Sequence, residues 1–457
     1  MSGATTVATV LCAVRGAREA EVVTTLAAPG LQVTRRCADV VELLAAAAAG
    51  AGRVAVVSCD LPALDRQAVV DLHAHDVRVV ALAPGGTWEE GRVRAYGVDA
   101  VVDLDSAPGG LCDVVRAVLP REAATGAPGV PRSVVDVGAT GPETEPRRGR
   151  TVAVWGPTGA PGRTTVATNL AAELAGPPPA RRARPPRRER PAADVDVPAG
   201  VLPSPEAEVL LVDADTYGGS VAQRLGLLDE SPGLAAAARS AGQGALDDAG
   251  LVALAPTVLP RVRVLTGLSR AARWPELPGA SLDAVWEVGR SVADWTVVDC
   301  GFGIERDELL TYDTRAPQRN DATWSALGAA DVVVVVGAGD PVGLQRLVRA
   351  LDELAETGAC VGAARAVVVN RVRASVVGPR PERAVRDAMA RYANVDDLHV
   401  VPEDGAVDLG LREGRTLAES APVSPARRAL ARLAAHVREA APSGRGAAHG
   451  LALEAAH

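Results

Sequence analysis

Lysine is absent from this chain of 457 residues, and all 48 of its basic side chains are arginine. The absence excludes every mechanism that needs a lysine amine, such as a Schiff base or a lysine that clamps phosphate in a nucleotide-binding loop. Aromatic residues make up only 2% of the chain, and Phe302 is the single phenylalanine. The core must therefore be built mainly from valine, leucine and alanine.

Metal-binding cysteine pairs and long apolar runs are also missing. The six cysteines form no CxxC pair, and most of them lie in apolar segments, so we interpret them as buried thiols in a reducing compartment. No apolar run reaches the roughly 18–20 residues of a membrane span, and no basic stretch precedes the first apolar segment. These observations predict a cytoplasmic protein.

The overall composition is typical of a soluble globular protein. Hydrophobic residues make up 48% and charged residues 23%, and the formal net charge is −8. A fully disordered chain, a collagen-like fibre and a surface built wholly for nucleic acid are excluded. The length predicts about two or three domains.

Short β-branched runs alternate with helix-length segments through residues 1–120. The expected strands are 7–14, 54–58, 79–82 and 98–102, and the expected helices lie near 38–49 and 111–119. Such alternation predicts a parallel α/β sheet domain.

A second α/β domain is predicted over residues 150–440, after a Pro/Gly-rich linker at 121–149. Its expected strands, about seven in one mostly parallel sheet with helices on both faces, are 151–155, 209–212, 262–265, 296–299, 332–336, 366–369 and 399–401. Residues 177–205 are rich in proline and arginine and predict a disordered insertion, and 441–457 predict a flexible tail.

The strongest chemical signal is the segment 151–170, TVAVWGPTGAPGRTTVATNL. A buried strand enters a Gly/Pro-rich turn that opens a helix, which is the layout of a phosphate-binding loop. A threonine hydroxyl at the start of such a helix can bind Mg²⁺. The standard pattern GxxxxGK(S/T) is degenerate here, because Pro157 replaces the first glycine and Arg163 replaces the lysine.

The loop resembles the deviant octet KGGxGKTT of the MinD/ParA family of P-loop ATPases. Residues 158–165 align with that octet, and Thr158 and Arg163 stand at its two lysines. Further segments similar to the family follow in the family's order, at 209–227, 294–303, 330–344, 367–372 and 400–422. The resemblance implies a P-loop NTPase domain that binds ATP or ADP with Mg²⁺.

The resemblance also implies roles for individual residues. The phosphate-binding loop would consist of Gly159, Ala160, Pro161, Gly162, Arg163, Thr164 and Thr165. Thr164 and Asp299 would hold Mg²⁺, and Asn370 would read the adenine edge. Asp215 would position an attacking water, with Arg163 as the catalytic cation. An aspartate at a strand end is also typical of a helix cap, and for Asp213 the two interpretations stay open.

Whether ATP is hydrolysed stays open at this point. Arginine keeps the charge of lysine, but its planar fork is larger and places its donors differently. Arg163 can reflect compositional drift in a lysine-free chain, or it can reflect lost catalysis. In the family the second lysine reaches across a dimer, which Thr158 cannot do, and the loss of both lysines favours weak nucleotide binding with weak or absent hydrolysis.

Residues 1–120 resemble a response-regulator receiver domain of the flavodoxin-like class. Asp60 stands where the phospho-acceptor would lie, at the end of the third strand. The acidic pair expected after the first strand is replaced by the segment 13–16, AVRG, and Ala83 stands where a serine or threonine is expected. The required lysine is absent, so we predict a pseudo-receiver that docks a partner without accepting a phosphoryl group.

A pseudo-receiver joined to a MinD/ParA-like domain is the arrangement of the CpaE/TadZ proteins, which include an actinobacterial septum-site-determining group. The resemblance implies a localisation factor for cell division or for pilus and secretion machinery, recruited to the membrane, pole or septum. Two alternatives stay open: a slow ATPase with a nucleotide-dependent homodimer cycle, and a ParA-like DNA partition protein.

Two further segments bear on partners. Six arginines lie in the range Arg181–Arg190, and they fit either a solvated loop or a weak contact with DNA or anionic membrane. The expected helix 424–441 carries Leu430, Leu433 and Val437 on one face, a stripe that we expect to pack on the sheet rather than on a membrane.

We expect deletion of residues 177–205 to change the free energy of unfolding by less than about 1 kcal/mol, because loop length alters closure entropy only slowly. Binding to DNA or anionic vesicles should weaken in its salt-sensitive part. Urea denaturation and salt titrations of binding check both expectations. A variant that cannot fold, or one that binds polyanions as tightly as the wild type, would contradict this view of the segment.

Overall fold

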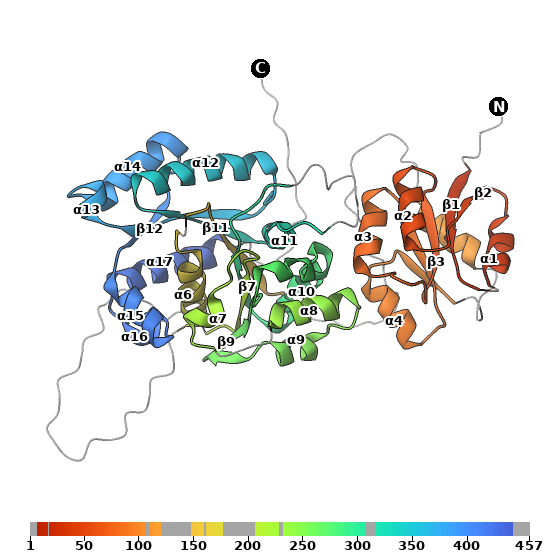
Figure 1. Cartoon of the computed structure of the whole chain (residues 1–457), viewed down its shortest axis with the longest axis horizontal. Helices are drawn as coiled ribbons and strands as arrows, with labels where there is room; N and C mark the ends of the chain where they lie inside the picture. Colours follow the sequence, from red (N-terminus) through yellow and green to blue (C-terminus); the bar gives the residue numbers. More distant parts are fainter. Residues whose placement is uncertain are drawn as a thin grey trace, which may run out of the picture.

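The computed structural model describes residues 7–16, 18–103, 105, 110–119, 148–159, 161–176, 206–227, 232–306 and 317–441 (Figure 1). The insertion predicted at 177–205, with its arginines Arg181–Arg190, lies outside these ranges. So do loop residue Ala160, the predicted linker up to residue 147 and the predicted tail from residue 442.

The amino-terminal unit is a parallel five-stranded sheet in the order β2-β1-β3-β4-β5. Its strands are β1 (Ala8–Ala13), β2 (Leu31–Arg36), β3 (Val54–Ser58), β4 (Arg78–Leu82) and β5 (Ala100–Val102). This strand order is the doubly wound, flavodoxin-like one. The sequence pattern missed β2, because this edge strand buries only Leu31 and otherwise carries polar or partly exposed residues.

Helices cover both faces of this sheet. They are α1 (Arg18–Leu26), α2 (Val40–Ala48), α3 (Arg66–Ala74), α4 (Trp88–Ala95) and α5 (Leu111–Val118). Helices α2, α3 and α4 pack into one apolar cluster, and α1 and α5 pack into the cluster on the other face. Asp39 and Asp65 start α2 and α3 by accepting hydrogen bonds from backbone N–H groups of the first turn.

The second unit is an eight-stranded sheet in the order β13-β12-β11-β6-β10-β7-β9-β8. Its strands are β6 (Arg150–Trp155), β7 (Val209–Ala214), β8 (Thr257–Leu259), β9 (Val262–Leu265), β10 (Trp295–Cys300), β11 (Val332–Ala338), β12 (Ala364–Val372) and β13 (Leu398–Pro402). All neighbouring strands run parallel except β8 and β9. The short edge strand β8 is the one that the sequence pattern did not predict.

Helices lie on both faces of this sheet as well, which confirms the predicted fold class of two α/β units. The helices are α6 (Arg163–Ala175), α7 (Val221–Arg224), α8 (Gly233–Gly242), α9 (Asp248–Leu254), α10 (Gly279–Val292), α11 (Asp321–Gly328), α12 (Pro341–Thr357), α13 (Ala374–Val377), α14 (Pro381–Ala393), α15 (Gly405–Glu413), α16 (Leu417–Ser420) and α17 (Pro425–Ala440), with a 3₁₀ helix at Ala271–Glu276. Helices α6 and α17 pack on one face, and α8, α10, α11 and α12 pack on the other.

The strand β6 and the helix α6 form the centre of this unit. Eleven of the thirteen residues of α6 are buried, so the helix is enclosed rather than amphipathic. The stripe of Leu430, Leu433 and Val437 on α17 is buried against the same side of the sheet, as expected. No helix among the described residues is long and apolar enough to cross a bilayer.

The two units contact each other through α3 and α4 on one side and α8 and α10 on the other (Figure 1). Gly244, in the turn after α8, lies beneath the backbone of α4. A Cβ atom at Gly244 would lie 2.9 Å from the Arg92 carbonyl oxygen and 3.1 Å from the Ala95 Cβ atom. The close approach of the two units therefore requires glycine at this position.

The variant Gly244→Ala should lose more stability than Gly50→Ala, its matched control. Both glycines have a positive φ, +66° and +67°, so both replacements add about 1 kcal/mol of backbone strain. A Cβ atom at Gly50 meets none of the described residues within 4 Å, whereas one at Gly244 must push the two units apart. We expect a further loss of about 1 kcal/mol or more, measured by urea denaturation. Equal losses would show that this contact does not hold the units together.

Candidate functional site

The candidate site lies at the carboxyl end of β6, where a turn of residues 156–162 leads into α6. Gly159 and Gly162 have φ values of +102° and +95°, which glycine adopts without the steric cost of a Cβ atom. A Cβ atom at Gly162 would collide with the Asn370 amide, and one at Gly159 would collide with the Arg346 guanidinium. The backbone therefore requires glycine at both positions, and the buried Asn370 amide adds a steric reason at Gly162.

Arg163, the residue at the lysine position, points back into this turn. Its Nη1 atom donates to the carbonyl oxygens of Gly156 and Pro157 at 3.1 and 3.0 Å, and its Nε atom donates to the Cys300 carbonyl oxygen at 3.1 Å. Its Nη2 atom lies 3.5 Å from Asp215 Oδ2. The side chain is only 11% exposed, so the guanidinium is held between the turn and the ends of two neighbouring strands.

Asp299 is the penultimate residue of β10, the strand beside β6, and lies in register with Val154 on one side and Asp213 on the other. The residue is 1% exposed, and neither carboxylate oxygen makes a hydrogen bond of normal geometry with the described residues. Burial raises the pKa of Asp299 well above its ordinary range, nearby Asp213 raises it further, and the neighbouring Thr164 and Arg163 offset this rise only in part. An unpaired buried carboxylate is costly unless a cation or a proton satisfies it.

The segment after β7 is organised by two aspartates. Asp213 accepts hydrogen bonds from the N–H groups of Asp215, at 3.3 Å, and Val221, at 3.0 Å, so its carboxylate caps the short helix α7. Asp215 Oδ1 accepts from the Tyr217 N–H at 2.8 Å, and its other oxygen faces Arg163. Asp213 therefore serves as a cap for α7 while it lies beside Asp299 in the candidate site, and Asp215 faces the loop. The role of Asp215 toward a water stays a prediction.

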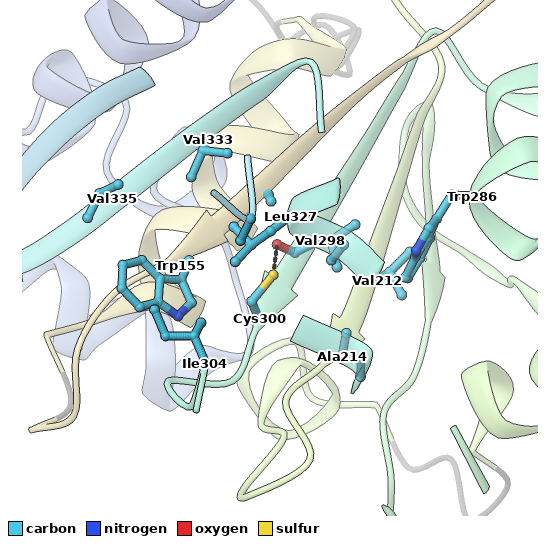
Figure 2. Packing of buried hydrophobic residues seen from close by; sticks show 14 of the residues in the cluster. Trp155, Val212, Ala214, Trp286, Val298, Cys300, Ile304, Leu327, Val333 and Val335 are labelled. Carbon is cyan, nitrogen blue, oxygen red and sulfur yellow. Dashed lines mark hydrogen bonds between the residues drawn. The ribbon is translucent and has the colours of Figure 1, made fainter. Parts of the chain in front are cut away.

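Burial raises the pKa of Asp213 to about 6. Its carboxylate is surrounded closely, because a Cβ atom at Gly219 or at Gly267 would lie 2.7 or 2.6 Å from its atoms. The opposite face of the same strands is apolar: Figure 2 shows Cys300, which follows Asp299, with its thiol directed at the Val298 carbonyl oxygen among Val298, Leu327 and Val212. The Asp213 carboxylate is therefore closely enclosed, and apolar side chains cover the opposite face of the strands that carry the two acids.

A cluster of aromatic and amide side chains joins the segments after β7 and β10 to the start of α11. The Tyr217 and Phe302 rings lie 4.4 Å apart, and the Arg319 guanidinium lies 4.0 Å from the centre of the Tyr217 ring. The Tyr217 hydroxyl donates to Asn320 Oδ1 at 2.8 Å. No sequence pattern marks this cluster, because its members are distant in the chain.

Two indole groups hold the same stretch from the other side. Trp155 Nε1 donates to the Phe302 carbonyl oxygen at 3.2 Å, and Trp324 Nε1 donates to the Ile304 carbonyl oxygen at 2.9 Å. The backbone just after β10 is therefore fixed by side chains from β6 and α11.

Asn370 lies under the loop. Its Nδ2 atom donates to the Pro161 carbonyl oxygen at 2.9 Å, and its Oδ1 atom accepts from the Arg371 N–H at 2.9 Å. The residue is 6% exposed. In this geometry Asn370 fixes the position of the turn, and its predicted contact with an adenine edge would require the amide to exchange these partners.

Two arginines near the site were missed by sequence reasoning. Arg346, exposed on α12, lies beside Gly159 and lines a small cleft with Thr158 and Asp340. Arg224, at the end of α7, lies close enough to Asp299 to feel its charge, and burial lowers the pKa of this guanidinium. Nothing local distinguishes these two among 48 arginines. Only the position of α12 after β11, the neighbour of β6, gave a signal for Arg346.

The structure thus brings together most of the predicted site residues. Gathered around the turn are Gly159, Pro161, Gly162, Arg163, Thr164, Asp215, Asp299 and Asn370. Thr165 lies one position further into α6 and is buried. Ala160 lies outside the described residues.

Acidification should stabilise the wild-type chain more than the variant Asp213→Asn. The pKa of Asp213 is about 6 in the folded chain, above its ordinary value of 3.8, so the folded state holds more protons than the unfolded state between these values. Stability therefore falls as the pH rises from about 4 to 6. From pH 7 to pH 5 the wild type should gain about 1 kcal/mol more than Asp213→Asn, measured by urea denaturation.

The control for this prediction is Asp294→Asn. Asp294 stands at the opposite end of β10, where its carboxylate accepts a hydrogen bond from the Glu208 N–H at 2.8 Å. Its replacement removes one carboxylate without touching the site. A pH dependence that is unchanged in Asp213→Asn would show that Asp213 is charged in the folded chain throughout this range.

Comparison with protein-family models and with curated proteins gives no match. Among solved structures the neighbours are P-loop ATPases of the MinD and ParA type at low sequence identity. The cell division ATPase MinD of Pyrococcus furiosus is 23% identical, and the match covers 64% of this chain and 99% of that chain with a TM-score of 0.45. A ParA family ATPase of Chlorobium tepidum is 17% identical, with 63% and 99% covered and a TM-score of 0.47. These sequence identities and TM-scores show a similar fold and do not assign the chain to the family of these proteins.

Proposed function

We propose that the chain is a localisation factor of the CpaE/TadZ kind that binds a Mg²⁺–adenine nucleotide weakly at the β6–α6 turn and hydrolyses it slowly or not at all. The amino-terminal unit would serve as the docking module. The partner would belong to the cell division machinery or to pilus and secretion machinery.

The observation that carries the nucleotide proposal is the buried Asp299 carboxylate, whose two oxygens lack hydrogen-bond partners among the described residues. Mg²⁺ prefers oxygen ligands and is typically held by a carboxylate together with phosphate oxygens. Asp299 and the neighbouring Thr164 hydroxyl would hold this ion. Bound there, Mg²⁺ would neutralise charge on the phosphates.

The turn itself fits a phosphate group. Its two positive-φ glycines let the backbone curl without the steric cost of a Cβ atom, and the first turn of the thirteen-residue helix α6 begins at Arg163. Free N–H groups at a helix start favour an anion. The basic side chain of Arg346, beside Gly159, and that of Arg224, near Asp299, add positive charge to the site.

Weak binding follows from the position of Arg163. Three of its hydrogen bonds already go to backbone carbonyl oxygens, and its remaining nitrogen, Nη2, faces Asp215. A phosphate would have to share or displace these contacts. Thr158 cannot replace the charge of the family's second lysine, and Asp215 cannot orient a water while it is paired with Arg163.

The docking role of the amino-terminal unit is supported by the surroundings of Asp60. The Arg15 guanidinium donates to the Asp60 carbonyl oxygen at 3.3 Å and lies 3.8 Å from its carboxylate. A cationic side chain thus stands where a phosphorylatable aspartate needs a metal ion held by acids. This arrangement fits a pseudo-receiver whose role is contact rather than phosphoryl transfer.

Calorimetric titration with ATP and ADP tests the nucleotide site. We expect Mg²⁺-dependent binding with a Kd between about 10 μM and 1 mM. Thr164→Ala and Asp299→Asn should remove the Mg²⁺-dependent part, because each loses an oxygen placed for the ion. Asp294→Asn, at the opposite end of β10, should bind like the wild type.

Absence of heat and of any thermal shift at millimolar ATP with Mg²⁺ would make the site vestigial. Phosphate release tests the hydrolysis proposal separately. Any turnover in the wild type should disappear in Asp215→Ala while nucleotide binding remains, since this variant keeps the turn and Asp299. Turnover that persists in Asp215→Ala would remove Asp215 from the mechanism.

A further inference from the structure

Three metal-ligating side chains gather at the edge of the second sheet, at the amino end of β13 and thus away from the turn before α6. They are Asp397, His399 and His436, and their ligand atoms all lie within 4.8 Å of one another. His436 Nδ1 lies 3.6 Å from Asp397 Oδ2, and the two imidazole rings are 4.7 Å apart in an edge-to-face arrangement. Nothing in the proposed nucleotide site uses these residues.

Two elements of the fold, β13 and α17, position these three residues. His399 is the second residue of β13 and lies on the face of the sheet on which α17 packs, and Asp397 immediately precedes the strand. Val401 continues the same face and is buried with Leu433 and Val437 of α17. His436 precedes Val437, so the packed face of the helix sets the position of this imidazole.

The cluster contains an unsatisfied buried atom. His399 Nε2 is buried and has no hydrogen-bond partner among the described residues. The Asp397 side chain is 75% exposed and that of His436 is 28% exposed, so one side of the cluster is open to solvent. The cluster therefore offers three ligand atoms for a metal ion. One imidazole has an unpaired buried nitrogen, and the exposed side leaves access for the ion and its water ligands.

The geometry points to a site for one divalent transition-metal ion, with Zn²⁺ as the best fit. The bound ion would cross-link the edge strand β13 and the helix α17. Two imidazoles and one carboxylate form a three-ligand set that zinc completes with water. Co²⁺, Ni²⁺ and Cu²⁺ accept the same donors, whereas Mg²⁺ and Ca²⁺ prefer oxygen alone. The guanidinium groups of Arg386 and Arg432 act on His399 electrostatically and weaken the attraction for a cation, so the affinity should be moderate.

Titration of the full chain with Co²⁺ tests the site, after treatment with EDTA and in the presence of excess Mg²⁺ to fill oxygen-rich sites. We expect one Co²⁺ per chain, with visible absorption bands of a low-symmetry nitrogen and oxygen site. Zn²⁺ should displace the Co²⁺ and raise the melting temperature, because it binds the folded chain. The variants His436→Gln and Asp397→Asn should weaken binding more than about tenfold.

Two controls separate this site from other histidines. His73 also contacts an aspartate, Asp99, at 2.8 Å, but the described residues give no three-ligand group there, so His73→Gln should bind Co²⁺ like the wild type. The double variant His449→Gln/His457→Gln should do the same. Asp397 is exposed, so Asp397→Asn keeps the test decisive where a histidine variant fails to fold. No binding at hundreds of micromolar Co²⁺ or Zn²⁺, or undiminished binding in Asp397→Asn, would overturn the proposal.

Discussion

The candidate site depends on how one buried guanidinium is shared among the groups around it. Arg163 binds two carbonyl oxygens of its own turn and one at the end of β10, and it faces Asp215. These contacts hold together the turn before α6, the end of β10 and the segment after β7. The same contacts occupy the donors that a phosphate would need. The Arg163 side chain therefore cannot hold the site together through these contacts and bind a phosphate with the same donors at the same time.

The two buried acids near Arg163 differ in whether their carboxylate oxygens have hydrogen-bond partners. Asp213 uses both carboxylate oxygens for backbone N–H groups, whereas Asp299 uses neither in the described residues. Burial raises the pKa of both Asp213 and Asp299, and the nearby Asp213 raises that of Asp299 further, so Asp299 favours a proton or a cation. The difference between a capped acid and an uncapped one is what separates a structural residue from a candidate metal ligand here.

Much of the fold and part of the site could be predicted because the signals are local. Buried β-branched runs mark the central strands, and the glycines before Thr164 mark the turn. The strand β2 was missed because an edge strand needs few apolar residues. The bond from Asn370 to the Pro161 carbonyl oxygen joins residues 209 positions apart, and the exposed Arg346 beside Gly159 is set by helix position. Such pairings depend on tertiary packing, and a single sequence does not encode them as a pattern.

The indoles of Trp155 and Trp324 both donate to backbone carbonyl oxygens just after β10, at Phe302 and Ile304. The chain has six tryptophans, so two of them are attached to the stretch that leads away from Asp299. An indole that loses a hydrogen bond and meets water changes the colour and intensity of its emission. The protein thus carries its own optical reporter of this stretch, and rearrangements there can be followed in the unlabelled chain on the timescale of mixing.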